Sequence, residues 1–318
     1  MATVRERLTG ELLQCYPEPG LLYDRIAAWL GVGGDQLLFH TGSDLEIKAV
    51  FETYIGRGDR ILLHQPGYAM YQVYARMFQA EVETQDYDVE LRFDLDHFSE
   101  RLDSRHRLVV LENPNGFVGN CHPLTKIREL VRKANRLGVI ALLDEAYFHF
   151  IDETLAAELA AFDNLIVVRT FSKAFGLAGV RAAYLLANPA MIRDLGRVKP
   201  MHELSGLAVM LIGALLDQPQ EMERFVLETA ASRDYLRAAL AELGIATSDS
   251  RANFVAARLG PRLDGDRAAR QLRESGILIR RPFREPHLRE WLRVGTAPLP
   301  VMERLVAGLR GLLDERKS

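Results

Sequence analysis

The sequence has few cysteines, little net charge and no long hydrophobic run. Its 318 residues include two cysteines, Cys15 and Cys121, which are too few for a disulfide scaffold and typical of a reducing cytoplasm. The 40 basic and 43 acidic side chains leave a net charge of -3, which favours neither a nucleic acid nor a membrane as partner. The longest apolar run, 206–216, is too short to span a bilayer. We therefore expect a cytoplasmic protein.

Metal and dinucleotide motifs are also missing. No spacing of histidine or cysteine matches a metal site, so we predict that no metal is bound. Gly31, Gly33 and Gly34 do not complete a dinucleotide-binding fingerprint, because Gln36 breaks its spacing.

What the chain does contain is a regular alternation of short apolar runs and helical patterns. Such alternation predicts a mostly parallel sheet covered by helices on both faces. The predicted strands of this part are 37–40, 60–64, 81–84, 107–111, 139–143, 165–168 and 181–187. The predicted helices are 43–54, 68–79, 95–102 and 124–136, preceded by helical pieces within 6–29 that break at 16–20. We predict an α/β fold of three layers.

The pattern changes after Pro189. The chain continues with predicted helices 205–216, 219–243 and 264–274, predicted strands 253–257, 277–280 and 291–294, and a terminal helix. These elements predict a smaller α+β unit. We predict a large domain at 30–218 and a small domain that combines 219–318 with 1–29.

The segment 169–181 holds the strongest candidate for a reactive group. Lys173 follows an apolar strand and lies between Phe171 and Phe175. Apolar surroundings disfavour the ammonium and lower its pKa, which an amine needs in order to attack a carbonyl. Thr170 and Arg181 on the same turn could hold a phosphate. A structural junction with a solvated lysine is the alternative, and this segment alone does not exclude it.

Other candidates follow the predicted strands, where ligands collect in open parallel sheets. Gly42, Ser43 and Asp44 open a helix, and free amides at such a start bind phosphate. A plain helix cap is the alternative there. Asp144 ends a buried strand and could pair with a protonated ring nitrogen, while Tyr147 could reach a phenolic oxygen on the same ring. Alternatively, Asp144 caps a turn and Tyr147 belongs to the core.

Two turns complete the set of candidates. The segment 113–119 is rich in asparagine and glycine, which are ordinary turn residues of low specificity. Tyr68, at the start of a predicted helix, would place an aromatic ring over the same crevice. Its alternative is a half-buried side chain with no ligand.

Together and in this order, these residues resemble a fold-type-I pyridoxal-phosphate-dependent aminotransferase, and more narrowly its histidinol-phosphate aminotransferase branch. The resemblance covers nearly the whole chain. Its most specific part is the series Thr170, Lys173 and Arg181, supported by Asp144 and Tyr147.

The resemblance implies a role for each residue. Lys173 would attach pyridoxal 5'-phosphate covalently and carry the α-proton, Asp144 would pair with the ring nitrogen, and Tyr147 would hydrogen-bond the 3-oxygen. Tyr68 would stack on the ring. The cofactor phosphate would be held by Gly42, Ser43, Asp44, Thr170, Ser172 and Arg181.

The resemblance also implies a partner subunit and a substrate site. Tyr16 begins a Tyr-Pro segment similar to one whose tyrosine reaches the cofactor phosphate of the neighbouring subunit, which implies a homodimer with shared active sites. Arg293 would clamp the substrate α-carboxylate, and Arg280 would be a second substrate-side arginine. A solvated surface side chain is the alternative for Arg280.

One departure from the family pattern concerns the 3-oxygen. Relatives carry Asn-Asn-Pro-Thr-Gly where this chain has Asn-Gly-Phe-Val-Gly at 115–119, so Gly116 replaces an asparagine that bonds the 3-oxygen. Losing this donor should raise the pKa of the lysine-bound cofactor, unless Asn115 or another group substitutes. The family's Asn-Glu-Asn-Pro-type segment, which covers the substrate, also has no counterpart in this sequence.

We therefore expect a dimeric aminotransferase that exchanges the amino group of a small amino acid or an amino-alcohol phosphate with a 2-oxo acid. One alternative is a decarboxylase of the threonine-phosphate type, which shares the cofactor contacts but releases carbon dioxide. Another is a diverged biosynthetic enzyme or cofactor-binding protein without transaminase activity.

Overall fold

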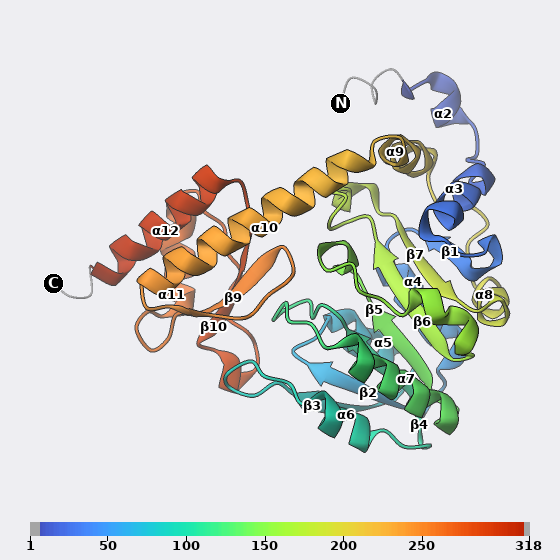
Figure 1. Cartoon of the computed structure of the whole chain (residues 1–318), viewed down its shortest axis with the longest axis horizontal. Coiled ribbons are helices and arrows are strands. Elements are labelled where there is room, and N and C mark those ends of the chain that lie inside the picture. The colour runs from blue at the N-terminus through green and yellow to red at the C-terminus, as the bar shows by residue number, and fades with distance from the viewer. Residues whose placement is uncertain (1–6, 315–318) are drawn as a thin grey trace.

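The computed structural model describes residues 7–314 and contains two β-sheets, with the long helix α10 leading from one to the other (Figure 1). The larger sheet has the strand order β1-β7-β6-β5-β4-β2-β3. Strand β7 is antiparallel to both of its neighbours, β1 and β6, and the other pairs in this sheet are parallel. The strands are β1 Leu37–His40, β2 Arg60–Gln65, β3 Glu81–Asp86, β4 His106–Glu112, β5 Ile140–Asp144, β6 Leu165–Thr170 and β7 Ala183–Ala187. The predicted α/β class is confirmed.

Helices cover both faces of this sheet. One face carries α3 (Gly20–Leu30), α6 (Leu95–Arg101), α7 (Leu124–Leu137) and α9 (Gly206–Leu216). The other carries α4 (Ser43–Tyr54), α5 (Ala69–Met77) and α8 (Pro189–Leu195). In β4, Val109 and Leu111 face the first group of helices, whereas Leu108 and Val110 face the second. Because both faces are covered, the central strands β4, β5 and β6 are mostly apolar. The edge strand β3, with the sequence Glu-Val-Glu-Thr-Gln-Asp, is mostly polar and largely exposed.

The smaller sheet is antiparallel, in the order β10-β9-β8. Its strands are β8 Ala246–Thr247, β9 Phe254–Arg258 and β10 Trp291–Gly295, and its helices are α10 Pro219–Glu242, α11 Gly265–Glu274 and α12 Leu299–Asp314. These elements share one hydrophobic cluster of their own, separate from the clusters of the larger sheet. This is the predicted α+β unit.

The division into domains at residue 218 stays a prediction. Helix α3, which we grouped with the small domain, packs Leu22, Ile26 and Ala27 into the core of the larger sheet. The short helix α2 (Gly10–Gln14) precedes it. Residues 1–6 and 315–318 of the predicted small domain lie outside the described residues.

One predicted strand is absent from the structure, and helix α8 and the short strand β8 were not predicted. Residues 277–280 form no strand, and Pro282 makes only an isolated bridge to Leu292. Proline has no N–H to donate, so this segment cannot continue a ladder beside β10. Helix α8 was not predicted, although Asn188 caps it and Pro189 occupies its first turn.

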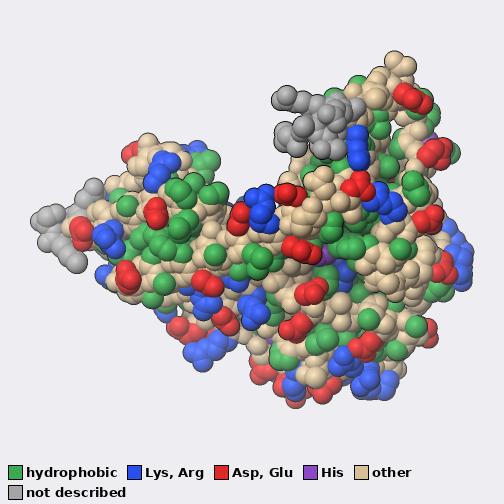
Figure 2. Space-filling model, turned by 45° about the horizontal axis from the view of Figure 1, so that its top comes forward, with side chains coloured by type: hydrophobic (Ala, Val, Ile, Leu, Met, Phe, Trp, Pro, Cys, Tyr) green, Lys and Arg blue, Asp and Glu red, His purple; other side chains and the backbone are tan. Residues whose placement is uncertain are grey.

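In the part of the chain that the structure describes, no helix combines the length and apolar character needed to cross a membrane. Figure 2 shows acidic and basic side chains interspersed over the visible face. That face therefore presents no broad area of a single charge.

Candidate active site

Three neighbouring strands end in polar side chains at the same edge of the larger sheet. Glu112 ends β4, Asp144 ends β5 and Thr170 ends β6. The parallel register places Glu112 beside Asp144. The sheet thus gathers groups that lie far apart in the sequence at its carboxyl edge, where open α/β sheets bind ligands.

Asp144 is a buried carboxyl group that forms no ion pair within the described residues. Its Oδ2 accepts a hydrogen bond from the Tyr71 hydroxyl at 2.7 Å, and its Oδ1 accepts one from the Ala146 N–H at 3.0 Å. Burial raises the pKa of Asp144 to about 7, and the neighbouring charge of Glu112 acts in the same direction. A cation placed here would favour the ionised carboxylate, so a protonated ring nitrogen fits this position.

A candidate anion site lies where helix α4 begins. Gly42 has a φ of 88°, and a Cβ at this position would lie 2.5 Å from Arg181 Nη2. Arg181 donates a hydrogen bond to Asp44 at 3.1 Å, and the Tyr68 hydroxyl donates to the other oxygen of the same carboxylate. No side chain caps the helix start. Open amides at Ser43 and Asp44, beside a guanidinium, suit a phosphate.

Lys173 lies close to Tyr147. Its Nζ is 5.1 Å from the centre of the Tyr147 ring, and within residues 7–314 it forms neither a hydrogen bond nor an ion pair. Thr170 Oγ1 is 2.9 Å from Ser172 Oγ, so the two hydroxyls lie together just before the lysine in the chain. The structure therefore brings Lys173, Tyr147, Thr170 and Ser172 to one edge of the sheet.

A cavity of about 1110 Å³ lies between α5 and the loop 280–289. Tyr68, Glu112, Arg280 and Arg293 line it, whereas Lys173 does not belong to its wall. Tyr68 is 37% exposed, so its ring is available from the cavity. The cavity therefore adjoins the site at Tyr68 and Glu112.

Arg293 projects from β10 of the smaller sheet. Its guanidinium stacks over Phe254, 4.6 Å from the ring centre, and donates a hydrogen bond to the Gly116 carbonyl. Burial lowers the pKa of Arg293, and the nearby charge of Arg280 acts in the same direction. Two like charges held together in one cavity favour an anionic ligand.

Asn115, which we predicted to contact the cofactor, bonds to its own loop in the structure. It is fully buried, and its Oδ1 accepts hydrogen bonds from the N–H groups of Phe117 and Val118, both at 2.8 Å. Its Nδ2 donates to the Pro66 carbonyl at 3.0 Å. The side chain therefore holds its own loop, because local side-chain to backbone bonds satisfy asparagine in turns.

Tyr16 lies outside this group of residues. It is 77% exposed, stacks on His202 with ring centres 4.3 Å apart, and lines a separate hollow with Cys15 and Met210. One chain alone does not bring Tyr16 to the site described above.

Sequence reasoning missed two side chains of the site, Tyr71 and Glu112. Tyr71 could have been found, because it lies three residues after Tyr68 on the same face of a helix. Glu112 was visible as a charged end to an apolar strand, but its register beside Asp144 is decided by strand pairing. Among the described residues, no cluster of histidine, cysteine or carboxylate side chains could hold a metal ion.

A mostly parallel sheet with an available lysine, a buried aspartate and an arginine-flanked helix start at its carboxyl edge defines a pyridoxal-phosphate-dependent transferase of fold type I. Residues 9–309 of this chain match the sequence model of the family of class I and II aminotransferases. The chain belongs to this family and is an aminotransferase.

Relatives of similar sequence share one name. A histidinol-phosphate aminotransferase 1 of Methylococcus capsulatus is 35% identical over 97% of this chain and 87% of its own length. A histidinol-phosphate aminotransferase of Citrifermentans bemidjiense is 33% identical over 95% of this chain and 85% of its own.

Solved structures show the same fold. The histidinol-phosphate aminotransferase of Sinorhizobium meliloti, in complex with pyridoxal 5'-phosphate, superposes with a TM-score of 0.89 at 26% identity and covers 99% of this chain and 86% of its own. The L-threonine-O-3-phosphate decarboxylase of Porphyromonas gingivalis has a TM-score of 0.85 at 23% identity, covering 98% and 94%.

Proposed function

We propose that this aminotransferase moves an amino group between a small amino acid or an amino-alcohol phosphate and a 2-oxo acid. Two arginines support this choice of substrate. Arg280 and Arg293 line one cavity, and neither forms an ion pair with a described residue. An anionic substrate would supply the missing counter-charge. Relatives named as histidinol-phosphate aminotransferases support the phosphate ester.

The cofactor is pyridoxal 5'-phosphate, and the chain offers a partner for each of its ends. The amides of Ser43 and Asp44 would hold its phosphate together with Arg181, and Thr170 and Ser172 would add hydroxyl groups. Bound there, the cofactor supplies an electron sink for the charge left when a bond to the substrate α-carbon breaks.

The remaining side chains orient groups and move the proton. Asp144 would hold the ring nitrogen in its protonated form, Tyr147 would bond the phenolic oxygen, and Tyr68 would cover the ring face. Lys173 would attach the cofactor and carry the proton to and from the α-carbon, because its amine is not engaged elsewhere in the described chain. Arg293 would fix the substrate anion from the smaller sheet.

The test combines a visible spectrum with product analysis. We expect purified protein to show the absorption of lysine-bound cofactor, and borohydride to fix that cofactor in the parent but not in Lys173→Ala. A panel of amino donors and 2-oxo acids should then show keto-acid exchange, with amino-alcohol phosphates among the donors. Equal borohydride labelling of parent and variant would contradict the assignment of Lys173.

The same panel separates the decarboxylase alternative, which is favoured by the fold shared with the threonine-phosphate decarboxylase. If the panel releases carbon dioxide and shows no keto-acid exchange, the enzyme is a decarboxylase and the proposed transamination is wrong. Cofactor binding with neither reaction would indicate a diverged protein.

We further propose a cytoplasmic homodimer with shared active sites. The exposed position of Tyr16, away from its own site, supports this arrangement, because an exposed aromatic side chain is available to a second subunit.

A further inference from the structure

Glu112 is a buried carboxyl group to which the proposed function gives no role. It ends β4, lines the cavity and is 4% exposed. Its Oε1 accepts a hydrogen bond from the Tyr68 N–H at 2.5 Å, and its Oε2 accepts one from the Gly116 N–H at 2.8 Å. These two bonds fix the carboxyl group between the loop that carries Tyr68 and the loop 115–119.

Glu112 occupies the space that a side chain at position 116 would need. A Cβ added to Gly116 would lie 2.8 Å from Glu112 Oε2 and 3.8 Å from Tyr147 Cε2. Because the first of these distances is too short for real atoms, any larger residue at 116 would require Glu112 to move. The acid at 112 thus reaches the place beside Tyr147 that a side chain at 116 would otherwise fill.

The acidic and basic groups around Glu112 come from three strands. Asp144 faces it from β5, and Arg293 faces it from β10. From β2, His64 Nε2 lies 3.8 Å from Glu112 Oε1, and burial lowers the pKa of His64 to about 4, so that this imidazole is neutral at pH 7.

Two phenols complete these surroundings. Burial raises the pKa values of Tyr71 and Tyr87, and both rings interact electrostatically with Glu112. Both phenols are therefore neutral at pH 7. Burial also raises the pKa of Glu112 to about 7, although the two backbone hydrogen bonds and Arg293 limit the rise. A carboxyl group in these surroundings can keep its proton near neutral pH and act as a donor.

Resting on the proposed function, we propose that Glu112 in its protonated form donates a hydrogen bond to the phenolic 3-oxygen of the cofactor, beside Tyr147. It would do so in place of the side chain that Gly116 lacks. A donor at this oxygen stabilises the phenolate, and it therefore lowers the pKa at which the lysine-bound cofactor gives up its proton.

The test follows the visible absorption of the lysine-bound cofactor as a function of pH, without substrate. We expect Glu112→Ala to raise the apparent pKa of this transition by about one unit, which is a tenfold change in proton affinity. We also expect it to weaken cofactor binding. Glu285→Ala is the matched control, because Glu285 is a carboxylate of the same cavity that bonds to Gln65, and its loss should leave the transition unchanged.

A second pair of variants keeps the test decisive if Glu112→Ala folds poorly. Gly116→Asn alone should destabilise the protein, since its Cβ collides with Glu112. Combining Gly116→Asn with Glu112→Ala should relieve that collision, supply an amide donor and return the apparent pKa to within a few tenths of a unit of the parent value. This reversal is a coupling that two independent sites would not show.

The outcomes separate the two proposals. A parent protein without lysine-bound absorption would overturn the proposed function. Normal absorption with the same apparent pKa in the parent and in Glu112→Ala would overturn the role of Glu112 alone. If the double variant is as unstable as Gly116→Asn, or if its apparent pKa does not return toward the parent value, then Glu112 does not replace a donor at position 116.

Discussion

Gly42 controls how closely the backbone approaches Arg181 at the start of α4. Alanine at this position would have to adopt a φ near 88°, and its Cβ would lie 2.5 Å from Arg181 Nη2. We expect Gly42→Ala to displace the guanidinium and to cost about 1–3 kcal/mol in cofactor binding, which is the usual size of such backbone strain. Titration with pyridoxal 5'-phosphate measures the affinity. Gly179→Ala is the control, because no atom lies within 4 Å of a Cβ there, and equal losses in both variants would contradict this role.

The Tyr71 hydroxyl donates a hydrogen bond to Asp144 and partly offsets the rise in pKa that burial causes. This bond favours the ionised carboxylate, so Tyr71→Phe should raise the pKa of Asp144 further and weaken cofactor binding by about 1 kcal/mol at neutral pH. Because the carboxylate must be ionised to hold a protonated ring, affinity should fall as the pH drops through about 7, and the fall should begin at higher pH in the variant. Cofactor titrations at several pH values measure this shift. Tyr74→Phe, on the same helix, should bind like the parent.

At the scale of single residues, sequence reasoning is most informative where the interacting groups are close in the chain. Lys173 and Thr170 are close in the chain, and their spacing already indicated a site. Glu112 and Asn115 show the limit of such reasoning. An asparagine at position 115 can hold its loop or contact a ligand, and the sequence does not distinguish the two. Its hydrogen bonds to the N–H groups of Phe117 and Val118 are visible only in the structure.

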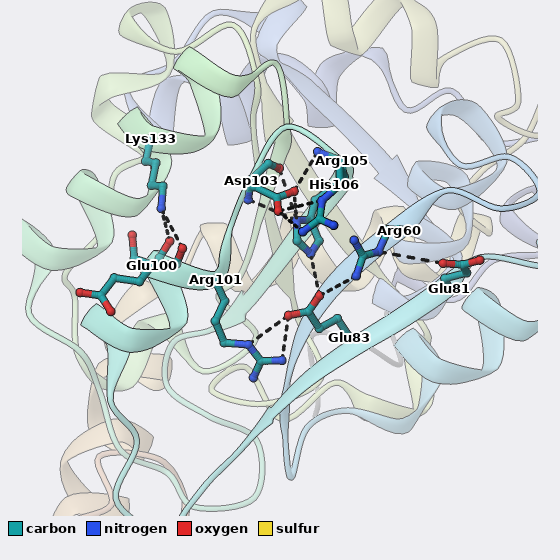
Figure 3. Close-up of polar contacts among 10 residues, drawn as sticks. Arg60, Glu81, Glu83, Glu100, Arg101, Asp103, Arg105, His106 and Lys133 are labelled. Atoms are coloured by element: carbon teal, nitrogen blue, oxygen red, sulfur yellow. Dashed lines mark hydrogen bonds and ion pairs between the residues drawn. The ribbon is translucent and has the colours of Figure 1, made fainter.

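At the scale of elements, a network of charged side chains joins β2, β3, β4 and α6, away from the site (Figure 3). Glu83 of β3 accepts hydrogen bonds from Arg101 at 2.8 Å and from Arg60 at 3.0 Å. The buried His106 ring lies 3.4 Å from the same carboxylate. Burial alone would raise the pKa of Glu83, but the hydrogen bond and charge of Arg101, with a smaller effect of His106, lower it overall.

This lowered pKa predicts how stability depends on pH. A carboxylate with a depressed pKa in the folded state contributes stability that is complete above its unfolded pKa of about 4.3 and is lost as the pH falls through the folded value. We expect Arg101→Ala to reduce the free energy of unfolding by about 1 kcal/mol at pH 7 and by less below pH 4. Urea unfolding at both pH values measures the difference. Arg105→Ala, on an exposed pair with Asp103, should have a smaller effect, and a larger one would contradict this account.

The mispredicted strand at 277–280 also belongs to this scale. The run Ile277-Leu278-Ile279 has the composition of a strand, but Leu278 is 72% exposed and no neighbouring strand pairs with the segment. Composition predicts a strand only when a partner edge is available, and Pro282 limits that edge to a single bridge with Leu292. The segment instead leads Arg280 into the cavity wall.

At the scale of the whole molecule, the shared site is a prediction about two subunits. We expect sedimentation to show a dimer, and Tyr16→Phe to weaken retention of the cofactor by about 1 kcal/mol, since one hydroxyl contact with the phosphate is lost. Mixing Tyr16→Phe with Lys173→Ala should restore tight retention at the lysine-containing sites, because each such site then receives an intact tyrosine from its partner. A monomer with full cofactor occupancy would contradict the shared site.

The order of apolar runs and helical patterns determined the three-layer α/β core, because central strands buried on both faces are mostly apolar. The local series around Lys173 indicated a reactive lysine beside a phosphate site, and only together with Asp144 and Tyr147 did it point to the class of chemistry. Only the tertiary structure decided which distant groups meet. The register of β4 with β5 puts Glu112 beside Asp144, and the smaller sheet brings Arg293 to Gly116, since strand pairing and packing depend on contacts between residues remote in the sequence.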